Sequence, residues 1–127
     1  MTTILLIRHG MTDAVGRRIA GWDPGVLLNE RGLEQVERLG RELATVKFDA
    51  IISSPLERAV MTAAAIAKHH SLTVSYREGL GEVRFGEWTG LTLDQLERDG
   101  RWKLWCTMRA SERAPGGETM LETQSRM

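Results

Sequence analysis

Short apolar runs alternate with longer amphipathic stretches along this chain. Three runs of about five residues, at 3–7, 49–53 and 72–76, have the apolar character of buried strands. Between them lie segments in which apolar side chains recur every three or four residues, as they do on one face of a helix. The order strand, helix, strand, helix, strand predicts an α/β domain with mostly parallel strands and no internal domain boundary.

Capping signals predict where the helices begin. Ser54, Pro55 and Glu57 suit the N-cap, first and third positions of a helix, with Glu57 closing a capping box. Thr92 and Gln95 form the same kind of pair, and the breaker at 114–117 precedes another helix. The predicted helices are Asn29 to about Val46, with an apolar stripe at Leu33, Val36, Leu39 and Leu43; Ser54 to about His70; Thr92 to Trp105; and a last helix from about Glu118.

Composition narrows the class of protein. The 127 residues carry 17 basic and 17 acidic side chains, and this balance argues against nucleic acid as the main partner. Cys106 is the single cysteine, so no intrachain disulfide is possible and we expect a reducing, cytoplasmic location. The N-terminal apolar run is too short for a signal peptide or a membrane span, so no membrane association is expected.

Candidate chemistry follows the three apolar runs. Arg8, His9 and Gly10 come directly after the first, Arg58 lies in the first helical turn after the second, and Glu82 lies in a glycine-rich loop after the third. Because the carboxyl ends of parallel strands share one edge of a sheet, these side chains are expected to converge. Arginines bind anions, histidine acts as a base or nucleophile near neutral pH, and a carboxyl group transfers protons. Arg58 and Glu82, each taken alone, are more typical of a solvated surface position, and Arg8-His9-Gly10 alone is a weak signal.

The remaining histidines carry little functional signal. His69 and His70 fall at a predicted helix C-terminus, where cationic side chains are favoured, and we interpret them as structural or surface residues. No cluster has the spacing of a metal site, so neither a metal nor another cofactor is expected.

The ordered motifs resemble the histidine phosphatase superfamily, also called phosphoglycerate mutase-like, over essentially the whole chain. The matching segments, in the family's order and spacing, are Arg8-His9-Gly10-Met11-Thr12, Gly21-Trp22-Asp23, Leu28-Asn29-Glu30-Arg31-Gly32, Ser53-Ser54-Pro55-Leu56-Glu57-Arg58-Ala59 with Thr62-Ala63, then Glu82, Phe85-Gly86, Trp88-Thr89-Gly90 and Pro115-Gly116-Gly117-Glu118-Thr119.

The resemblance implies a three-layer α/β/α sandwich and a metal-independent phosphomonoester hydrolase. His9 would become phosphohistidine, Arg8 and Arg58 would bind the phosphoryl oxygens, and Glu82 would protonate the leaving alkoxide and then activate water. The substrate is expected to be a small phosphorylated molecule. The residues that this resemblance assigns to substrate binding are Arg8, Gly10, Thr12, Ala20, Gly21, Arg58 and Glu82.

One part of the family pattern is absent. The family has a second catalytic histidine at the end of a later strand, which lies between the first two strands of the sheet, and no such segment follows the Pro115-Gly116-Gly117-Glu118 motif before Met127. We therefore expect residues 1–127 to be the N-terminal part of a single phosphatase domain with an incomplete sheet. Exposed strand edges recruit other chains, so a homodimer is one expectation.

Two other functions stay open at this point. A phosphoglycerate mutase is the alternative within the family, although Met11-Thr12-Asp13-Ala14-Val15 differs from the mutase pattern and only a short helix precedes the proline-rich break. An inactive fragment that binds phosphate or a partner through Arg8 and Arg58 is the alternative of another class. Arg17, Arg18 and Arg84 are candidates for selecting an anionic leaving group, or are simply solvated.

Overall fold

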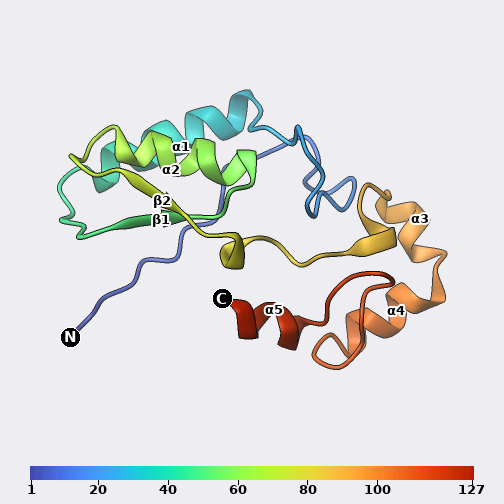
Figure 1. The fold of residues 1–127 in the computed structure, drawn as a ribbon. Helices are drawn as coiled ribbons and strands as arrows, with labels where there is room; N and C mark the ends of the chain where they lie inside the picture. The colour runs from blue at the N-terminus through green and yellow to red at the C-terminus, as the bar shows by residue number, and fades with distance from the viewer.

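The computed structural model describes residues 1–127 and divides into an α/β half and a helical half (Figure 1). The α/β half contains α1 (Glu30–Leu43), β1 (Ile51–Ser53), α2 (Glu57–Ala67) and β2 (Val74–Tyr76). The helical half contains the 3-10 turns η1 (Glu78–Leu80) and η2 (Gly86–Trp88), then α3 (Leu93–Glu97), α4 (Gly100–Thr107) and α5 (Met120–Arg126). No helix has the length and apolar character needed to span a membrane.

The α/β half contains the predicted parallel pairing. β1 and β2 are neighbours in a two-stranded parallel sheet, with Ile51 opposite Val74. α1 and α2 lie side by side over this sheet, and their shared core is formed by Leu28, Val36 and Ala65 (Figure 1). The chain therefore forms the sheet and one helical layer of the α/β architecture.

The first predicted strand, at residues 3–7, is wrong for this structure. The segment runs as an unpaired coil past the sheet, and its backbone forms no hydrogen bond with another backbone group (Figure 1). Ile4 and Leu6 are 75% and 93% exposed. An apolar composition indicates that the side chains favour burial. A strand also needs a neighbouring strand that forms hydrogen bonds with its backbone N–H and C=O groups. Here β1 pairs only with β2, and residues 3–7 have no partner.

The start of α2 differs from the prediction by two residues. The Ser54 hydroxyl accepts from the Leu56 N–H at 3.2 Å, and the helix begins only at Glu57, with Leu56 as an N-cap without a side-chain cap. The Glu57 carboxylate does not close a capping box, because it accepts from the Gly25 N–H at 2.9 Å. A tertiary contact with the loop that precedes α1 thus replaces the local one.

The other caps follow the predicted chemistry more closely. Asn29 caps α1 through the Gly32 N–H, although Leu33 of the predicted apolar stripe stays 47% exposed. The Thr92–Gln95 capping box forms, but the expected single helix to Trp105 is divided into α3 and α4. Asp99 causes the division, since its extended backbone and its bond from the Arg101 N–H make it the N-cap of a new helix.

The helical half packs around aromatic side chains. Val83, Phe85, Trp88, Leu96, Trp105 and Ala114 form its buried core, and Cys106 packs at its edge. Two loop segments close against each other here, because the Glu118 N–H donates to the Arg84 carbonyl and the Glu87 N–H to the Pro115 carbonyl, each at 2.8 Å. This pairing brings α5 back toward the loop that precedes η2 (Figure 1).

Candidate active site

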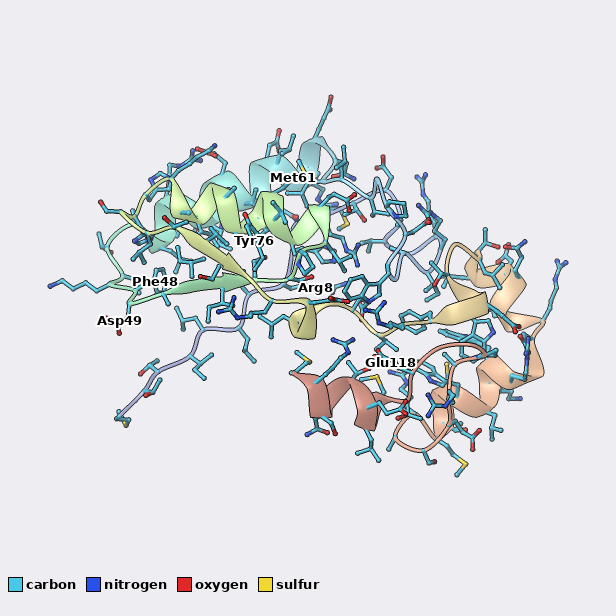
Figure 2. All side chains as sticks on the ribbon, viewed as in Figure 1. Arg8, Phe48, Asp49, Met61, Tyr76 and Glu118 are labelled. Carbon is cyan, nitrogen blue, oxygen red and sulfur yellow. The ribbon has the colours of Figure 1, made fainter.

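The candidate residues gather at the carboxyl end of the two strands. Figure 2 shows Arg8 at the end of the sheet opposite to Phe48 and Asp49, which precede β1. Arg58 enters from the first turn of α2, directly after β1. The charges of Arg58, Arg8 and Glu82 all act on the His9 imidazole. The structure thus brings together the four residues that the sequence singled out.

Gly10 packs the backbone beside His9 closely against α1 and α2. Its N–H donates to the Thr62 hydroxyl at 3.1 Å, and that hydroxyl donates to the Arg58 carbonyl at 2.8 Å. A Cβ at Gly10 would lie 2.8 Å from the carbonyl oxygen of Gly32 in α1, a distance that only glycine avoids. Residue 10 therefore needs glycine for close packing. The Thr62 hydroxyl links the backbone next to His9 to the backbone of Arg58.

The contacts of His9 leave one ring nitrogen available. Nδ1 lies 2.7 Å from the Gly10 carbonyl oxygen, which can only accept, so Nδ1 carries the hydrogen and Nε2 holds the lone pair of the neutral ring. Desolvation lowers the pKa of His9 below 6.5; the bond to Gly10 and the charge of Glu82 oppose this, while the charges of Arg58 and Arg8 reinforce it. A neutral imidazole at neutral pH is a nucleophile.

Arg58 is a buried cation with an unused donor. Its side chain is 3% exposed, and Nη2 donates to the Gly21 carbonyl at 2.9 Å. Nη1 is buried and has no hydrogen-bond partner. Burial lowers the pKa of Arg58, against the opposing charges of Glu82 and Glu57, but a guanidinium remains charged at any physiological pH. A buried, incompletely paired guanidinium is costly, and an anion beside it would remove that cost.

Arg8 is exposed and lines a hollow of about 410 Å³ together with His9 and Gly10. The other wall of this hollow comes from α1, with Gln35, Val36, Arg38, Leu39 and Glu42. Arg58 and Glu82 do not line it, so the hollow lies beside the converging charges and does not contain all of them. No set of three His, Cys, Asp or Glu side chains comes together as metal ligands.

Glu82 is exposed, and its carboxylate accepts from the N–H of Val83 at 3.0 Å. Its position depends on the backbone, because its carbonyl accepts from the Trp22 indole N–H and from Arg126, the latter at 2.8 Å. The Glu82 carboxylate is therefore accessible to a solute, while its main chain is held by Trp22 and Arg126.

The remaining predicted binding residues make backbone contacts, of which that of Gly21 reaches a residue of the site. Gly21 has a φ of +48° and presents its carbonyl to Arg58, a conformation that favours glycine. The carbonyls of Ala20 and the buried Thr12 accept from Asp23 and Val15, each closing a turn. Their contacts with a substrate stay predictions.

Sequence reasoning gave no role to the residues that hold the backbone of the site in place. Thr62 follows Arg58 by one helical turn, a spacing typical of hydroxyl bonds to a preceding carbonyl, so this contact had a local signal. Arg126 had no such signal, because it reaches Glu82 across 44 positions of the chain. Glu118 belongs to one of the matching motifs, but nothing in the sequence indicated its contact with Arg126. His69 and His70 lie just beyond the end of α2, half-buried, as expected for structural residues.

Comparison with known proteins decides the family. The family model of the histidine phosphatase superfamily, branch 1, matches residues 4–127. The chain belongs to the histidine phosphatase superfamily. Phosphoserine phosphatase 1 of Hydrogenobacter thermophilus is 30% identical over 131 residues, which cover 100% of this chain and 61% of that protein.

Solved structures of superfamily members agree with the fold. The α-ribazole phosphatase of Shigella flexneri superposes with a TM-score of 0.85 at 32% identity, covering 94% of this chain and 60% of the other. A mycobacterial glucosyl-3-phosphoglycerate phosphatase in complex with inorganic phosphate gives a TM-score of 0.80 at 30% identity, covering 93% of this chain and 55% of that one. The α/β fold is thus phosphoglycerate mutase-like, and the chain spans about three fifths of these relatives.

Proposed function

We propose that this chain carries the nucleophile and the main anion site of a metal-independent phosphomonoester hydrolase. The observation that carries the proposal is the buried Nη1 of Arg58, a cationic donor without a partner next to a neutral imidazole. Phosphoryl transfer depends mainly on positioning and on stabilising negative charge spread over the phosphoryl oxygens. Arg58 and Arg8, whose charges both act on His9, supply that charge.

The proposed reaction has two steps. Nε2 of His9 attacks phosphorus, the P–O ester bond breaks, and its electron pair leaves on the alkoxide, which takes a proton from the Glu82 carboxyl group. Glu82, now ionised, accepts a proton from water, whose oxygen attacks phosphohistidine. The P–N bond breaks and returns the electron pair to Nε2, which releases inorganic phosphate. The bond from Nδ1 to Gly10 keeps the same nitrogen available in every cycle.

The substrate class follows from this chemistry. An exposed Arg8 and an open hollow beside His9 suit a small phosphomonoester that is reached from solvent. The relatives named above are phosphatases, which favours water over a second substrate hydroxyl as the acceptor. Residues 1–127 would then be the N-terminal part of a single phosphatase domain. A reducing, cytoplasmic location accords with the single cysteine.

The test is turnover of p-nitrophenyl phosphate by the chain, with release of inorganic phosphate measured independently. The proposal expects activity that falls by at least about 100-fold in His9→Ala and in Arg58→Gln. Arg41→Gln is the matched control, because Arg41 is an exposed arginine of α1 that pairs with Glu37 and does not line the hollow.

Three other outcomes would change the assignment. Conversion of phosphoglycerate isomers without release of phosphate would favour the mutase. Binding of phosphate without turnover would leave only an anion-binding function for the chain. Unchanged turnover in His9→Ala would remove the imidazole from the mechanism.

A further inference from the structure

Arg126, in the last turn of α5, binds the backbone of the loop that carries Glu82. Its guanidinium donates to the carbonyl of Gly79, to that of Gly81 at 3.0 Å and to that of Glu82 at 2.8 Å. The side chain is only 22% exposed. Three carbonyls within four residues of the loop thus accept from one planar, multidentate donor, which a lysine could not replace.

Glu118 holds the Arg126 guanidinium in that orientation. Its carboxylate accepts from Nε and Nη2 of Arg126, both at 3.0 Å, and also from the Arg84 N–H at 3.0 Å and the Thr123 hydroxyl at 3.2 Å. These contacts, led by the bond from Arg126, lower the pKa of Glu118 to about 2. Figure 2 shows Glu118 between α5 and the segment that leads from the Glu82 loop to α3. The pair stays ionised at any working pH.

Trp22 confines the same loop through a second contact. Its indole N–H donates to the Glu82 carbonyl, and a Cβ on Gly81 would lie 2.0 Å from the indole ring. Arg84 stacks on the Trp22 ring, 4.2 Å from its centroid, and its guanidinium also lies 3.9 Å from Glu118. The backbone at 81–82 is therefore held by Trp22 and Arg126 together.

We propose that Arg126 is a positioning residue, which fixes the loop backbone so that the Glu82 carboxylate stays within reach of the group transferred at His9. The inference rests on the proposed function. Glu82 is exposed, and its only side-chain hydrogen bond is to the N–H of the next residue, so nothing distant fixes the carboxylate directly. The position of the Glu82 carboxylate therefore depends on the position of its main chain, which Arg126 holds.

The first experiment compares leaving groups. An alkoxide needs a proton as it leaves, whereas p-nitrophenolate needs little help. Glu82→Gln should lower kcat/KM, which reports the step that phosphorylates His9, by about 100-fold with an alkyl phosphate such as glycerol 3-phosphate and far less with p-nitrophenyl phosphate. Arg126→Ala should reproduce the same selectivity, about tenfold against about twofold, and Arg126→Lys should restore little. A merely structural defect would lower both rates equally.

Arg113→Ala is the matched control. Arg113 also pairs with a carboxylate of α5, Glu122, but contacts Gly117 and none of residues 79–82. Its loss should leave the ratio of the two rates unchanged. An equal loss of both rates in Arg126→Ala, or the same selectivity in Arg113→Ala, would overturn the inference.

The second experiment needs no turnover. The charge of Glu82 acts on His9, as do those of Arg58 and Arg8, whereas Arg126 does not act on it directly. Titration of His9 followed by NMR should give a lower pKa in Arg126→Ala than in the parent, because a displaced Glu82 supports the imidazolium less. In a chain that also carries Glu82→Gln, Arg126→Ala should have no further effect.

The two proposals fail differently. A shift of the His9 pKa in Glu82→Gln without one in Arg126→Ala would overturn the positioning role alone. An identical effect of Arg126→Ala with and without Glu82 would do the same. Absence of any leaving-group effect in Glu82→Gln would remove Glu82 from the proposed mechanism and, with it, any role for Arg126 in positioning it.

Discussion

Replacement of Glu118 by glutamine should destabilise the chain in a strongly pH-dependent way. The carboxylate accepts two bonds from Arg126, one from the Arg84 N–H and one from Thr123, and its side chain is only 17% exposed. Hydrogen bonds to a charged group contribute about 1.5–3 kcal/mol each, but glutamine keeps one acceptor oxygen. After allowance for solvent screening, we expect Glu118→Gln to lower the free energy of unfolding by about 2 kcal/mol at pH 7.

The sign of the pH dependence follows from the lowered pKa. Because the folded-state pKa is about 2 and the ordinary value is 4.5, the ionised carboxylate stabilises the fold above pH 4.5, and this contribution is lost as the pH falls toward 2. Urea unfolding followed by circular dichroism at pH 7, 5, 4 and 3 should therefore show the parent and Glu118→Gln converging in acid. A difference that stays constant from pH 7 to pH 3 would refute the reasoning.

Glu42→Gln is the control for this experiment. Glu42 forms an ion pair with Arg38 one turn away on α1, and the two side chains are 57% and 76% exposed. Exposed pairs of this kind contribute at most about 0.5 kcal/mol. Glu42→Gln should therefore change the unfolding free energy little at any pH, which separates the buried network from a general effect of removing a negative charge.

Three further predictions concern His9 and the backbone beside it. The value of kcat/KM for p-nitrophenyl phosphate should fall in acid with a midpoint below 6.5, since desolvation keeps the His9 imidazole neutral; a midpoint above 6.5 would contradict this. Thr62→Val should lower the unfolding free energy by about 1–3 kcal/mol, because the buried Gly10 N–H loses its acceptor, whereas Thr62→Ser should restore most of it in the same urea assay. Gly32→Ala should lower the free energy of unfolding by about 1–3 kcal/mol, because the added Cβ would lie 2.1 Å from the Met11 carbonyl oxygen. Gly100→Ala is the control, because its Cβ would meet no atom within 4 Å, and it should raise the melting temperature. Equal effects of the two substitutions would refute the packing argument.

The sequence predicted best where the determinants are local. Asn29 and the Thr92–Gln95 pair cap their helices through residues three positions away, and both contacts form. The parallel pairing of β1 and β2 follows from an apolar run, a helix and a second apolar run. The rule that parallel strands end at one edge of the sheet accounts for the position of Arg58 after β1, but not for that of His9, because residues 3–7 lie outside the sheet; the bond from the Gly10 N–H to Thr62 holds the backbone beside His9 against α2.

Features that depend on distant partners escaped prediction. Residues 3–7 have the composition of a strand but no neighbour to pair with, and Glu57 leaves its local cap for the Gly25 N–H. The contact between Arg126 and the Glu82 loop joins positions 44 apart, and no periodicity in the sequence marks it. Composition and spacing describe what one segment favours, whereas these contacts depend on which segments the fold brings together.

Detection of a phosphoryl group on His9 would test the central claim most directly. The chain would be mixed with excess p-nitrophenyl phosphate, quenched rapidly in base, where phosphohistidine survives, and digested for mass spectrometry. The proposed mechanism predicts an acid-labile phosphoryl group on the peptide that contains His9, absent from His9→Ala and diminished in Arg58→Gln. Turnover of the substrate with no phosphoryl group on His9, or with one on His69 or His70 instead, would contradict it.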